Sequence, residues 1–135
     1  MGEVRGGFAL ASGWASVGRI LVVDDEPDLR FILRRILIRA GHDVVEAGDG
    51  AAALTSVDES PPDLVVTDMM MPVMGGVELI RRLHADPATA AIPILAVSGD
   101  WQLAVDADAA LAKPYQRAEL LMLAEGLLRK GREGR

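Results

Sequence analysis

Short apolar runs alternate with amphipathic segments along most of this chain, and that order limits the fold more than any other feature. The apolar runs have the length of single strands and occupy 19–23, 42–47, 63–67 and 92–97. Segments with helical periodicity follow them from Pro27 up to Gly41, then at 49–57, at 75–86 and at about 116–130. Continuous apolar runs of this length suit strands that are covered on both faces. The alternation therefore predicts a parallel sheet wrapped by helices, with right-handed crossovers.

The connection between the fourth and fifth strands is too short for a full helix. A fifth strand is expected just before Lys113, which lies 15 positions after Ser98. If that strand takes about five residues, about ten remain, which is near the minimum for a crossover between parallel strands. We therefore expect an α/β protein of five strands, in which the fourth helix is truncated to one or two turns or is missing.

The composition restricts the class of protein. With 135 residues, half of them hydrophobic, the chain suits one domain with a sizeable core. The net charge of −6 argues against a nucleic-acid surface, and no apolar run reaches the roughly 18 residues that span a bilayer. Cysteine is absent, which fits a reducing compartment, so we expect a cytoplasmic protein with no nucleic-acid or membrane partner. Residues 1–17 are expected to form a disordered leader, 18–130 the folded domain, and 131–135 a tail that begins where Gly131 ends the last helix.

Five polar residues lie at the predicted carboxyl ends of strands. Asp24 and Asp25 follow the first strand, and Asp68 ends the third. Ser98 follows the fourth strand and Lys113 follows the fifth. Each of these residue types is common at a strand end as a helix cap, but ligands of a doubly wound sheet bind at this same edge. We therefore expect the five side chains to form one site.

Three carboxylates in one place need compensation by positive charge. Two carboxylates about 5 Å apart repel by roughly 3 kcal/mol at an effective dielectric constant near 20. Either one of them keeps a proton or a cation is recruited, and an open site of oxygen atoms suits Mg²⁺. With Mg²⁺ and Lys113 present, the site is suited to an anionic group such as a phosphoryl group. Asp68 is then the expected nucleophile, because carboxylates form acyl phosphates.

Four motifs resemble the receiver domain of two-component response regulators: "ILVVDDEPD", "DLVVTDMMMPVMGG", "ILAVSG" and "AKP". The resemblance covers 19–130 and implies a flavodoxin-like (βα)5 doubly wound fold with strand order 2-1-3-4-5. It implies that Asp68 receives a phosphoryl group from a histidine kinase or a histidine phosphotransfer protein. Ser98 would donate a hydrogen bond to that group, and Lys113 would pair with it.

The same resemblance implies a set of metal ligands. Asp25, Asp68 and the backbone carbonyl of Met70 would bind Mg²⁺, and Asp24 would act through water. The other methionines of this stretch are expected to pack, since a thioether is a poor ligand for a hard cation. Pro72 is expected to hold the loop in shape, and the glycine pair after it to let the backbone turn into the next helix.

The chain departs from the family at its usual conformational switch. The family often has Tyr or Phe three residues before the lysine, and that ring turns inward when the phosphoryl group is engaged. This chain has Ala110 there, and a methyl group cannot report by rotating. Trp101 and Tyr115 are the candidate substitutes, with partial core packing as the alternative for both.

Several functions fit these observations. The first is a single-domain receiver that signals by phosphorylation-dependent binding to an unknown downstream protein. The second is a receiver segment of a hybrid histidine kinase, or a phosphate shuttle. A phosphatase with an aspartyl-phosphate intermediate would carry a second acid two residues after the nucleophile, where this chain has Met70. A binding module that has lost phosphorylation would lack an acid or the lysine, and none is missing.

The chain is therefore expected to catalyse only its own phosphorylation and dephosphorylation, and not to be an enzyme that acts on other substrates. Its first helix is the element where receivers commonly meet the kinase or phosphotransfer helix. The arginines of that helix are expected on a solvated face, with contact to such a partner as the alternative: Arg30, Arg34, Arg35 and Arg39.

Overall fold

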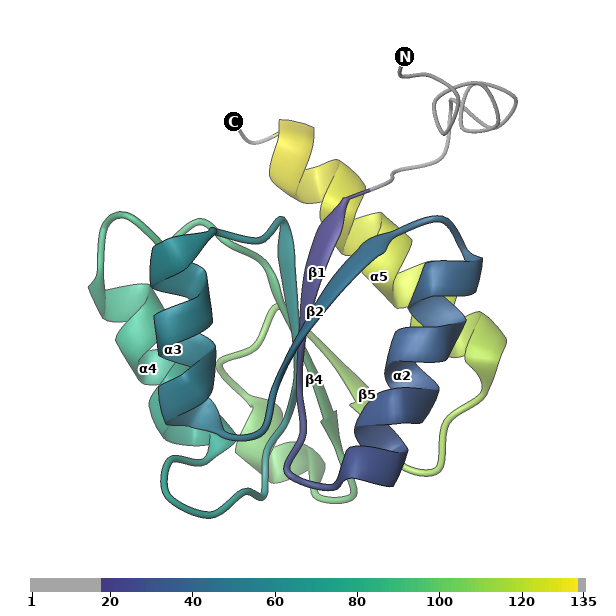
Figure 1. Cartoon of the computed structure of the whole chain (residues 1–135), viewed down its shortest axis with the longest axis horizontal. Coiled ribbons are helices and arrows are strands. Elements are labelled where there is room, and N and C mark those ends of the chain that lie inside the picture. Colours follow the sequence, from purple (N-terminus) through teal and green to yellow (C-terminus); the bar gives the residue numbers. More distant parts are fainter. Residues whose placement is uncertain (1–17, 134–135) are drawn as a thin grey trace.

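The computed structural model describes residues 18–133, which form a five-stranded parallel sheet with helices on both faces (Figure 1). The strands are β1 (Arg19–Val23), β2 (Asp43–Ala47), β3 (Leu64–Asp68), β4 (Ile94–Ser98) and β5 (Ala109–Ala112). The helices are α2 (Pro27–Arg39), α3 (Gly50–Glu59), α4 (Gly76–Ala85) and α5 (Arg117–Glu133), together with a 3-10 turn, η1 (Trp101–Ala104). The strands pair in the order β2-β1-β3-β4-β5, so the predicted flavodoxin-like, doubly wound fold is confirmed.

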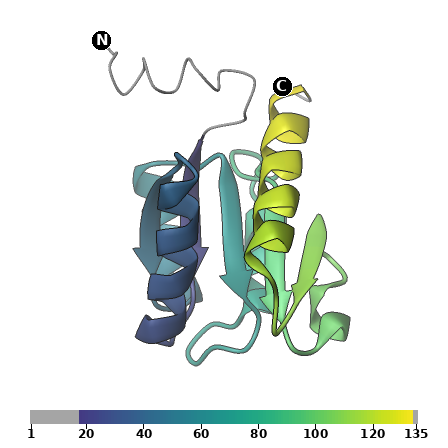
Figure 2. The ribbon, with the colours of Figure 1, turned by 90° about the vertical axis from the view of Figure 1, so that its right-hand side faces the viewer.

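Alternate residues of each central strand face opposite helical layers. Helices α2 and α5 cover one face of the sheet, and α3 and α4 cover the other (Figures 1 and 2). In β1, Ile20 and Val22 pack toward α2 and α5, whereas Leu21 and Val23 pack toward α3 and α4. All four side chains are buried. A strand covered on both faces has no solvated side, which is why the sequence shows continuous apolar runs here and not alternation.

Local chemistry explains where the first two helices begin and end. Pro27 is the first residue of α2, a position where its missing N–H would have no partner in the helix. Gly41 follows α2 with a φ of 102°, a left-handed conformation that glycine adopts without strain. At the start of α3, the Asp49 side chain accepts a hydrogen bond from the N–H of Ala52 at 2.8 Å. These signals are readable from the sequence, and both helices begin at or next to the residues expected.

The connection from β4 to β5 contains one short turn of helix, as its length predicted. The turn η1 spans Trp101–Ala104, and Asp100 caps it by accepting a hydrogen bond from the N–H of Gln102 at 3.0 Å. The truncated fourth helix is therefore confirmed. The side chain of Trp101, a candidate substitute for the switch residue, lies outside the described parts of the structure.

Two side chains that helical periodicity places on the apolar stripes of their helices are about half exposed. Ile32 in α2 is 47% exposed and Val77 in α4 is 49% exposed. Leu33 and Leu37 make the core contacts of α2, and Leu79 contributes to those of α4. The apolar stripe of each helix is wider than the strip that touches the sheet, so residues at the margin of the stripe stay exposed.

The last helix does not end at Gly131, and that prediction is wrong. Helix α5 continues to Glu133, while residues 134–135 lie outside the described residues. A Cβ atom at Gly131 would lie 3.4 Å from Cγ of Pro93, an ordinary van der Waals distance, so the helix passes close to the turn before β4 at this residue. The predicted disordered leader, residues 1–17, also falls outside the described part of the chain. Within that part, no helix is both long enough and apolar enough to cross a membrane.

Candidate functional site

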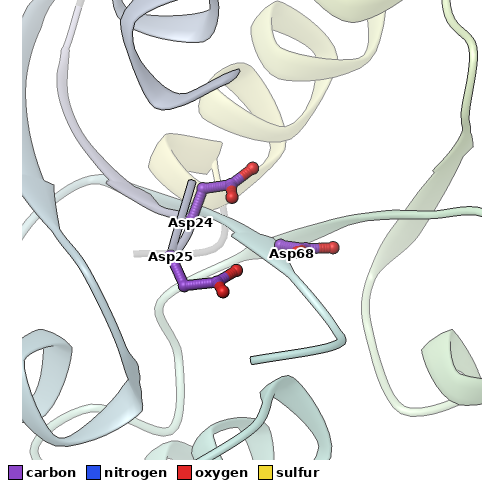
Figure 3. A group of neighbouring side chains, drawn as sticks. All are labelled: Asp24, Asp25 and Asp68. Carbon is purple, nitrogen blue, oxygen red and sulfur yellow. The ribbon is translucent and has the colours of Figure 1, made fainter. Parts of the chain in front are cut away.

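Three aspartates meet at the carboxyl edge of the sheet, and in Figure 3 their carboxylates extend toward the same side. Asp24 and Asp25 follow β1, and Asp68 is the last residue of β3, the strand next to β1. One oxygen atom from each carboxylate lies within 4.8 Å of those of the other two. Asp24 is 1% exposed and Asp68 is 8% exposed, whereas Asp25 is half-buried. Neighbouring parallel strands bring their carboxyl ends together, so the sheet topology produces this cluster.

Burial and neighbouring negative charges disfavour the ionised form of the Asp24 carboxyl group. Burial raises its pKa above the usual value, and the negative charges of Asp68 and Asp25 raise it further. A hydrogen bond from the N–H of Glu26 to Asp24 Oδ1 at 2.9 Å opposes the rise, as does the positive charge of Lys113. The pKa therefore rises on balance, in the direction expected for crowded carboxylates.

Asp68 is held in place by three contacts around the end of β3. The Nζ atom of Lys113 lies 3.3 Å from Asp68 Oδ1, and the N–H of Met69 donates to the same oxygen at 2.9 Å. The hydroxyl of Thr67 donates to the backbone carbonyl of Asp68 at 2.7 Å. Every residue of β3 is buried, so this carboxylate projects from a closely packed strand.

Ser98 ends β4 at the same edge, where its neighbour Val97 pairs with Asp68. The Ser98 hydroxyl donates to the carbonyl of Asp100 at 3.1 Å and accepts from the N–H of Asp100 at 3.0 Å. These two bonds close a small turn after the strand. To donate to a ligand, the hydroxyl would first have to release the Asp100 carbonyl.

The loop between β3 and α4 differs from the sequence-based expectation. Its left-handed residue is Val73, with a φ of 69°, and neither of the two glycines that were expected to make the turn. The N–H of Met74 donates to the carbonyl of Pro72 at 2.8 Å, which closes a three-residue turn around Val73. A β-branched residue in this conformation carries about 1–3 kcal/mol of strain. No sequence signal identifies such a position, because valine is among the residues least suited to it.

Close packing, and not an unusual φ, requires glycine at position 76. A Cβ atom on Gly76 would lie 2.6 Å from Sδ of Met69 and 2.8 Å from the carbonyl oxygen of Asp68. The packing role predicted for Met69 is confirmed, since this residue is 3% exposed. The Met70 side chain is 68% exposed, which agrees with the expectation that its side chain is not needed at the site.

Tyr115, a candidate substitute for the switch residue, borders the acid cluster. It packs against the core layer under α2 and α5 and is partly buried. Together with Asp24 and Lys113 it lines a cavity of about 540 Å³ beside α2. Burial raises the pKa of the Tyr115 hydroxyl, and the charge of Asp24 raises it further. Tyr115 thus shows the partial core packing that was the alternative for it, and its role as a substitute switch stays a prediction; Ala110 is exposed.

Arg30 is a site residue that the sequence did not single out. It was expected on a solvated face, but its Nη1 atom donates to the backbone carbonyl of Asp24 at 2.6 Å. Its Nε atom donates to Oε1 of Glu46 at 2.9 Å. Helical periodicity separates the faces of a helix, but it does not show which long side chain folds back over the preceding loop.

The donor set of the cluster fits a hard divalent cation. All three donors are carboxylates, which Mg²⁺ prefers together with water. Ligands on opposite sides of Mg²⁺ are about 4.2 Å apart. The spacing of up to 4.8 Å is slightly wider, so a bridging water or a small side-chain rotation is needed. Asp24 Oδ1 already accepts the Glu26 N–H, which suits the water-mediated role expected for Asp24.

Comparisons with known proteins agree on the family that this chain resembles. A family model described as the response regulator receiver domain matches residues 20–125. The chain is 38% identical over 119 residues to the DNA-binding response regulator MtrA of Mycolicibacterium smegmatis. Among solved structures, it is similar to the chemotaxis response regulator CheY4 of Vibrio cholerae, with a TM-score of 0.76, 29% identity, and coverage of 82% of this chain and 98% of that one. It is also similar to the receiver domain of the sensor histidine kinase PA1611 of Pseudomonas aeruginosa, with magnesium coordinated in the active-site cleft, at a TM-score of 0.78, 26% identity, and coverage of 83% and 98%.

The match to the relative from Mycolicibacterium smegmatis covers 85% of this chain but 52% of the relative, so the chain spans about half of that protein's length. The relative is named as a DNA-binding protein, and the comparisons therefore do not support the predicted exclusion of nucleic acid. That prediction rests on the net charge of −6 alone.

Proposed function

Because this chain belongs to the response regulator receiver domain family of two-component signalling, we propose that Asp68 accepts a phosphoryl group from a histidine kinase or a histidine phosphotransfer protein. One observation carries the proposal: the Asp68 carboxylate ends a buried strand, lies 3.3 Å from Lys113 Nζ, and is grouped with Asp24 and Asp25 within 4.8 Å. An acid fixed in this way combines a nucleophile with the charges that phosphoryl transfer requires.

Asp68, Lys113 and Ser98 have separate roles in the proposed reaction. Both hydrogen bonds to the Asp68 side chain go to Oδ1, so Oδ2 is the oxygen placed to attack phosphorus. An O–P bond forms as the P–N bond to the donor histidine breaks, and the imidazole leaves with the electron pair. Lys113 offsets negative charge on the transferred oxygens. The Ser98 hydroxyl turns from Asp100 to donate to one of them.

The acid cluster is also the proposed magnesium site. Asp25, Asp68 and the carbonyl of Met70 would hold Mg²⁺, with Asp24 acting through water. Bound Mg²⁺ supplies charge neutralisation on the phosphoryl oxygens. The oxygen-only donor set supports this assignment, and so does the similar receiver of PA1611, which has magnesium in its active-site cleft.

The surface between α2 and α5 supports a protein partner. Phe31 and Ile32 of α2 are 51% and 47% exposed, and they border a cavity of about 560 Å³. Three arginines line the same cavity: Arg35, Arg39 and Arg117. A partner helix that presents its histidine to Asp68 would cover the apolar side chains and match the arginines with acidic residues. We further propose that phosphorylation changes the affinity for a downstream protein, and that the chain catalyses only its own phosphorylation and dephosphorylation.

Incubation with acetyl phosphate and Mg²⁺, followed by intact mass spectrometry, tests this function. We expect the mass of one added phosphoryl group in the wild type and no addition in Asp68→Asn. Asp63→Asn is a matched control, because it changes an aspartate at the opposite edge of the sheet and should leave labelling intact. Equal labelling of wild type and Asp68→Asn, or no labelling of wild type with Mg²⁺ present, would overturn the proposal.

A further inference from the structure

Arg30 connects the loop of the acid cluster to the neighbouring strand β2. Its guanidinium group donates to the Asp24 carbonyl at 2.6 Å and to Glu46 Oε1 at 2.9 Å. Glu46 is held from a second side as well, because Nε of Arg34 lies 3.1 Å from its other oxygen, Oε2. Arg30 is largely covered, with 21% of its side chain exposed, whereas Glu46 is exposed, with 36%. The guanidinium group therefore has two defined partners, the Asp24 carbonyl and the Glu46 carboxylate.

The bond to Asp24 acts on the backbone between the two acids. The Asp24 carbonyl belongs to the peptide unit that joins Asp24 to Asp25, so rotation of this unit would redirect both side chains. The N–H of Asp24 is fixed separately by the carbonyl of Ala47 at 3.1 Å. The Arg30 bond fixes the other end of the residue, so β2 holds the loop through Ala47 directly and through Glu46 indirectly.

We propose that Arg30 is a positioning residue for the acid cluster: by clamping the Asp24 carbonyl to Glu46, it sets the direction of the Asp24 and Asp25 carboxylates toward Asp68. Arg30 touches no reacting atom and acts through the loop. The inference rests on the magnesium site of the proposed function, and it adds a residue outside the ligand set.

The direction in which Mg²⁺ affinity changes when Arg30 is replaced distinguishes a positioning role from a purely electrostatic one. Arg30 is a cation near a cluster that attracts a divalent cation, so by Coulomb's law alone its removal should strengthen Mg²⁺ binding. If Arg30 orients the ligands, its removal should weaken binding despite the loss of that repulsion. Residues that orient metal ligands typically alter metal affinity by about 10- to 100-fold.

Calorimetric titration of the full chain with Mg²⁺ tests the inference, and the neighbouring arginine provides a matched control. Arg30→Met should weaken Mg²⁺ binding by about 10-fold. Arg34→Met removes an arginine of the same helix that contacts the same glutamate, through Oε2 at 3.1 Å and not through the Asp24 carbonyl. It should leave the affinity unchanged or make it slightly tighter. Arg30→Lys keeps the charge but loses the fork, and its affinity should fall between those of the wild type and Arg30→Met.

Each outcome decides the question. Affinity in Arg30→Met equal to or tighter than wild type would overturn the positioning role and leave the proposed function intact. Equal weakening in Arg30→Met and Arg34→Met would also overturn it, because only one of them contacts the Asp24 carbonyl. If Arg30→Met does not fold, Arg30→Lys decides alone, and wild-type affinity there counts against the inference. Absence of Mg²⁺ binding in the wild type would defeat the magnesium site itself, and the positioning role with it.

Discussion

At the amino edge of the sheet, two aspartates each complete a hydrogen bond between neighbouring strands, whereas at the carboxyl edge three aspartates face one another. Asp63 directly precedes β3 and accepts the N–H of Arg19, the first residue of β1, at 2.9 Å. Asp108 directly precedes β5 and accepts the N–H of Ile94, the first residue of β4, at 2.8 Å. In both cases, a carboxylate satisfies a backbone donor that the sheet leaves open at its edge.

The carboxyl edge uses the same residue type in the opposite way. Asp24, Asp25 and Asp68 gather within 4.8 Å, and burial and mutual repulsion raise the pKa of Asp24. A carboxylate that accepts a backbone N–H stabilises the fold, whereas crowded carboxylates oppose it in the absence of a cation. The difference shows that residue type alone does not separate a structural acid from a functional one, since the neighbours decide.

Removing a carboxylate acceptor from the amino edge should have the largest effect on stability. Asp63→Ala removes the acceptor of the Arg19 N–H, and hydrogen bonds to charged groups contribute about 1.5–3 kcal/mol. We expect the free energy of unfolding to fall by about 2 kcal/mol in urea titrations. Asp63→Asn keeps an oxygen acceptor and should lose less than half as much. An Ala variant that unfolds at the wild-type urea concentration would contradict the structural role of this edge.

Removing one negative charge from the carboxyl edge should change the free energy of unfolding by less, and in the opposite direction. In buffer free of divalent cations, Asp24→Asn removes one of three crowded charges and keeps an oxygen for the Glu26 N–H. We expect the free energy of unfolding at neutral pH to rise by about 1 kcal/mol, measured by thermal or urea unfolding. Asp68→Asn should gain less, because Lys113 loses its ion pair. Excess Mg²⁺ should reverse the gain, since it stabilises only a cluster that binds it.

The pH dependence of that gain follows from the raised pKa of Asp24. The folded state holds this proton more tightly than the unfolded chain does. The stabilising contribution is therefore fully present below the usual aspartate pKa of about 3.9, and it is lost as the pH rises through the raised pKa. The stability difference between Asp24→Asn and wild type should grow from acid to neutral pH. A difference that is constant across this range would rule out the Asp24 carboxyl group as its source.

Glu78, an acid on the surface of α4, lies outside both edges and serves as a reference for them. Its substitution should have the smallest effect on stability. Arg81 and Arg82 donate hydrogen bonds to Glu78 and lower its pKa to about 2. The contribution of this ionised glutamate is present above the usual glutamate pKa and is lost as the pH falls through about 2. Because the group is in solvent, Glu78→Gln should change the melting temperature by no more than the error of measurement. A clear loss of stability would contradict this and show that these exposed ion pairs contribute measurably to the stability of the fold.

Much of the fold and part of the site could be predicted because they depend on local pattern. Apolar runs and helical periodicity placed the strands and helices, and the number of residues between Ser98 and Lys113 predicted the shortened fourth helix. Since parallel strands end at a common edge, the position of each polar residue after its strand predicted which side chains would meet. The same reasoning predicts from the sequence that Asp24, Asp25 and Asp68 lie together.

Other features could not be predicted because they depend on contacts between residues distant in sequence or on departures from usual preference. Arg30 reads as a solvated helix residue, and its role appears only when Glu46 of β2 lies beside it. Val73 adopts a left-handed φ that valine disfavours. The exposure of residues at the margin of an apolar stripe could not be predicted either. Ile32 and Val77 belong to such stripes but lie outside the contact with the sheet.

By itself, the sequence determined the order of strands and helices and the identity of the acids, lysine and serine at the carboxyl ends, because periodicity and position along a strand are local properties. Only the tertiary structure decided how the acids are oriented, which arginine clamps their loop, and that Gly131 continues a helix packed against Pro93. Those outcomes depend on which side chains approach one another across the sheet, and the free energies of such contacts are absent from any local stretch of chain.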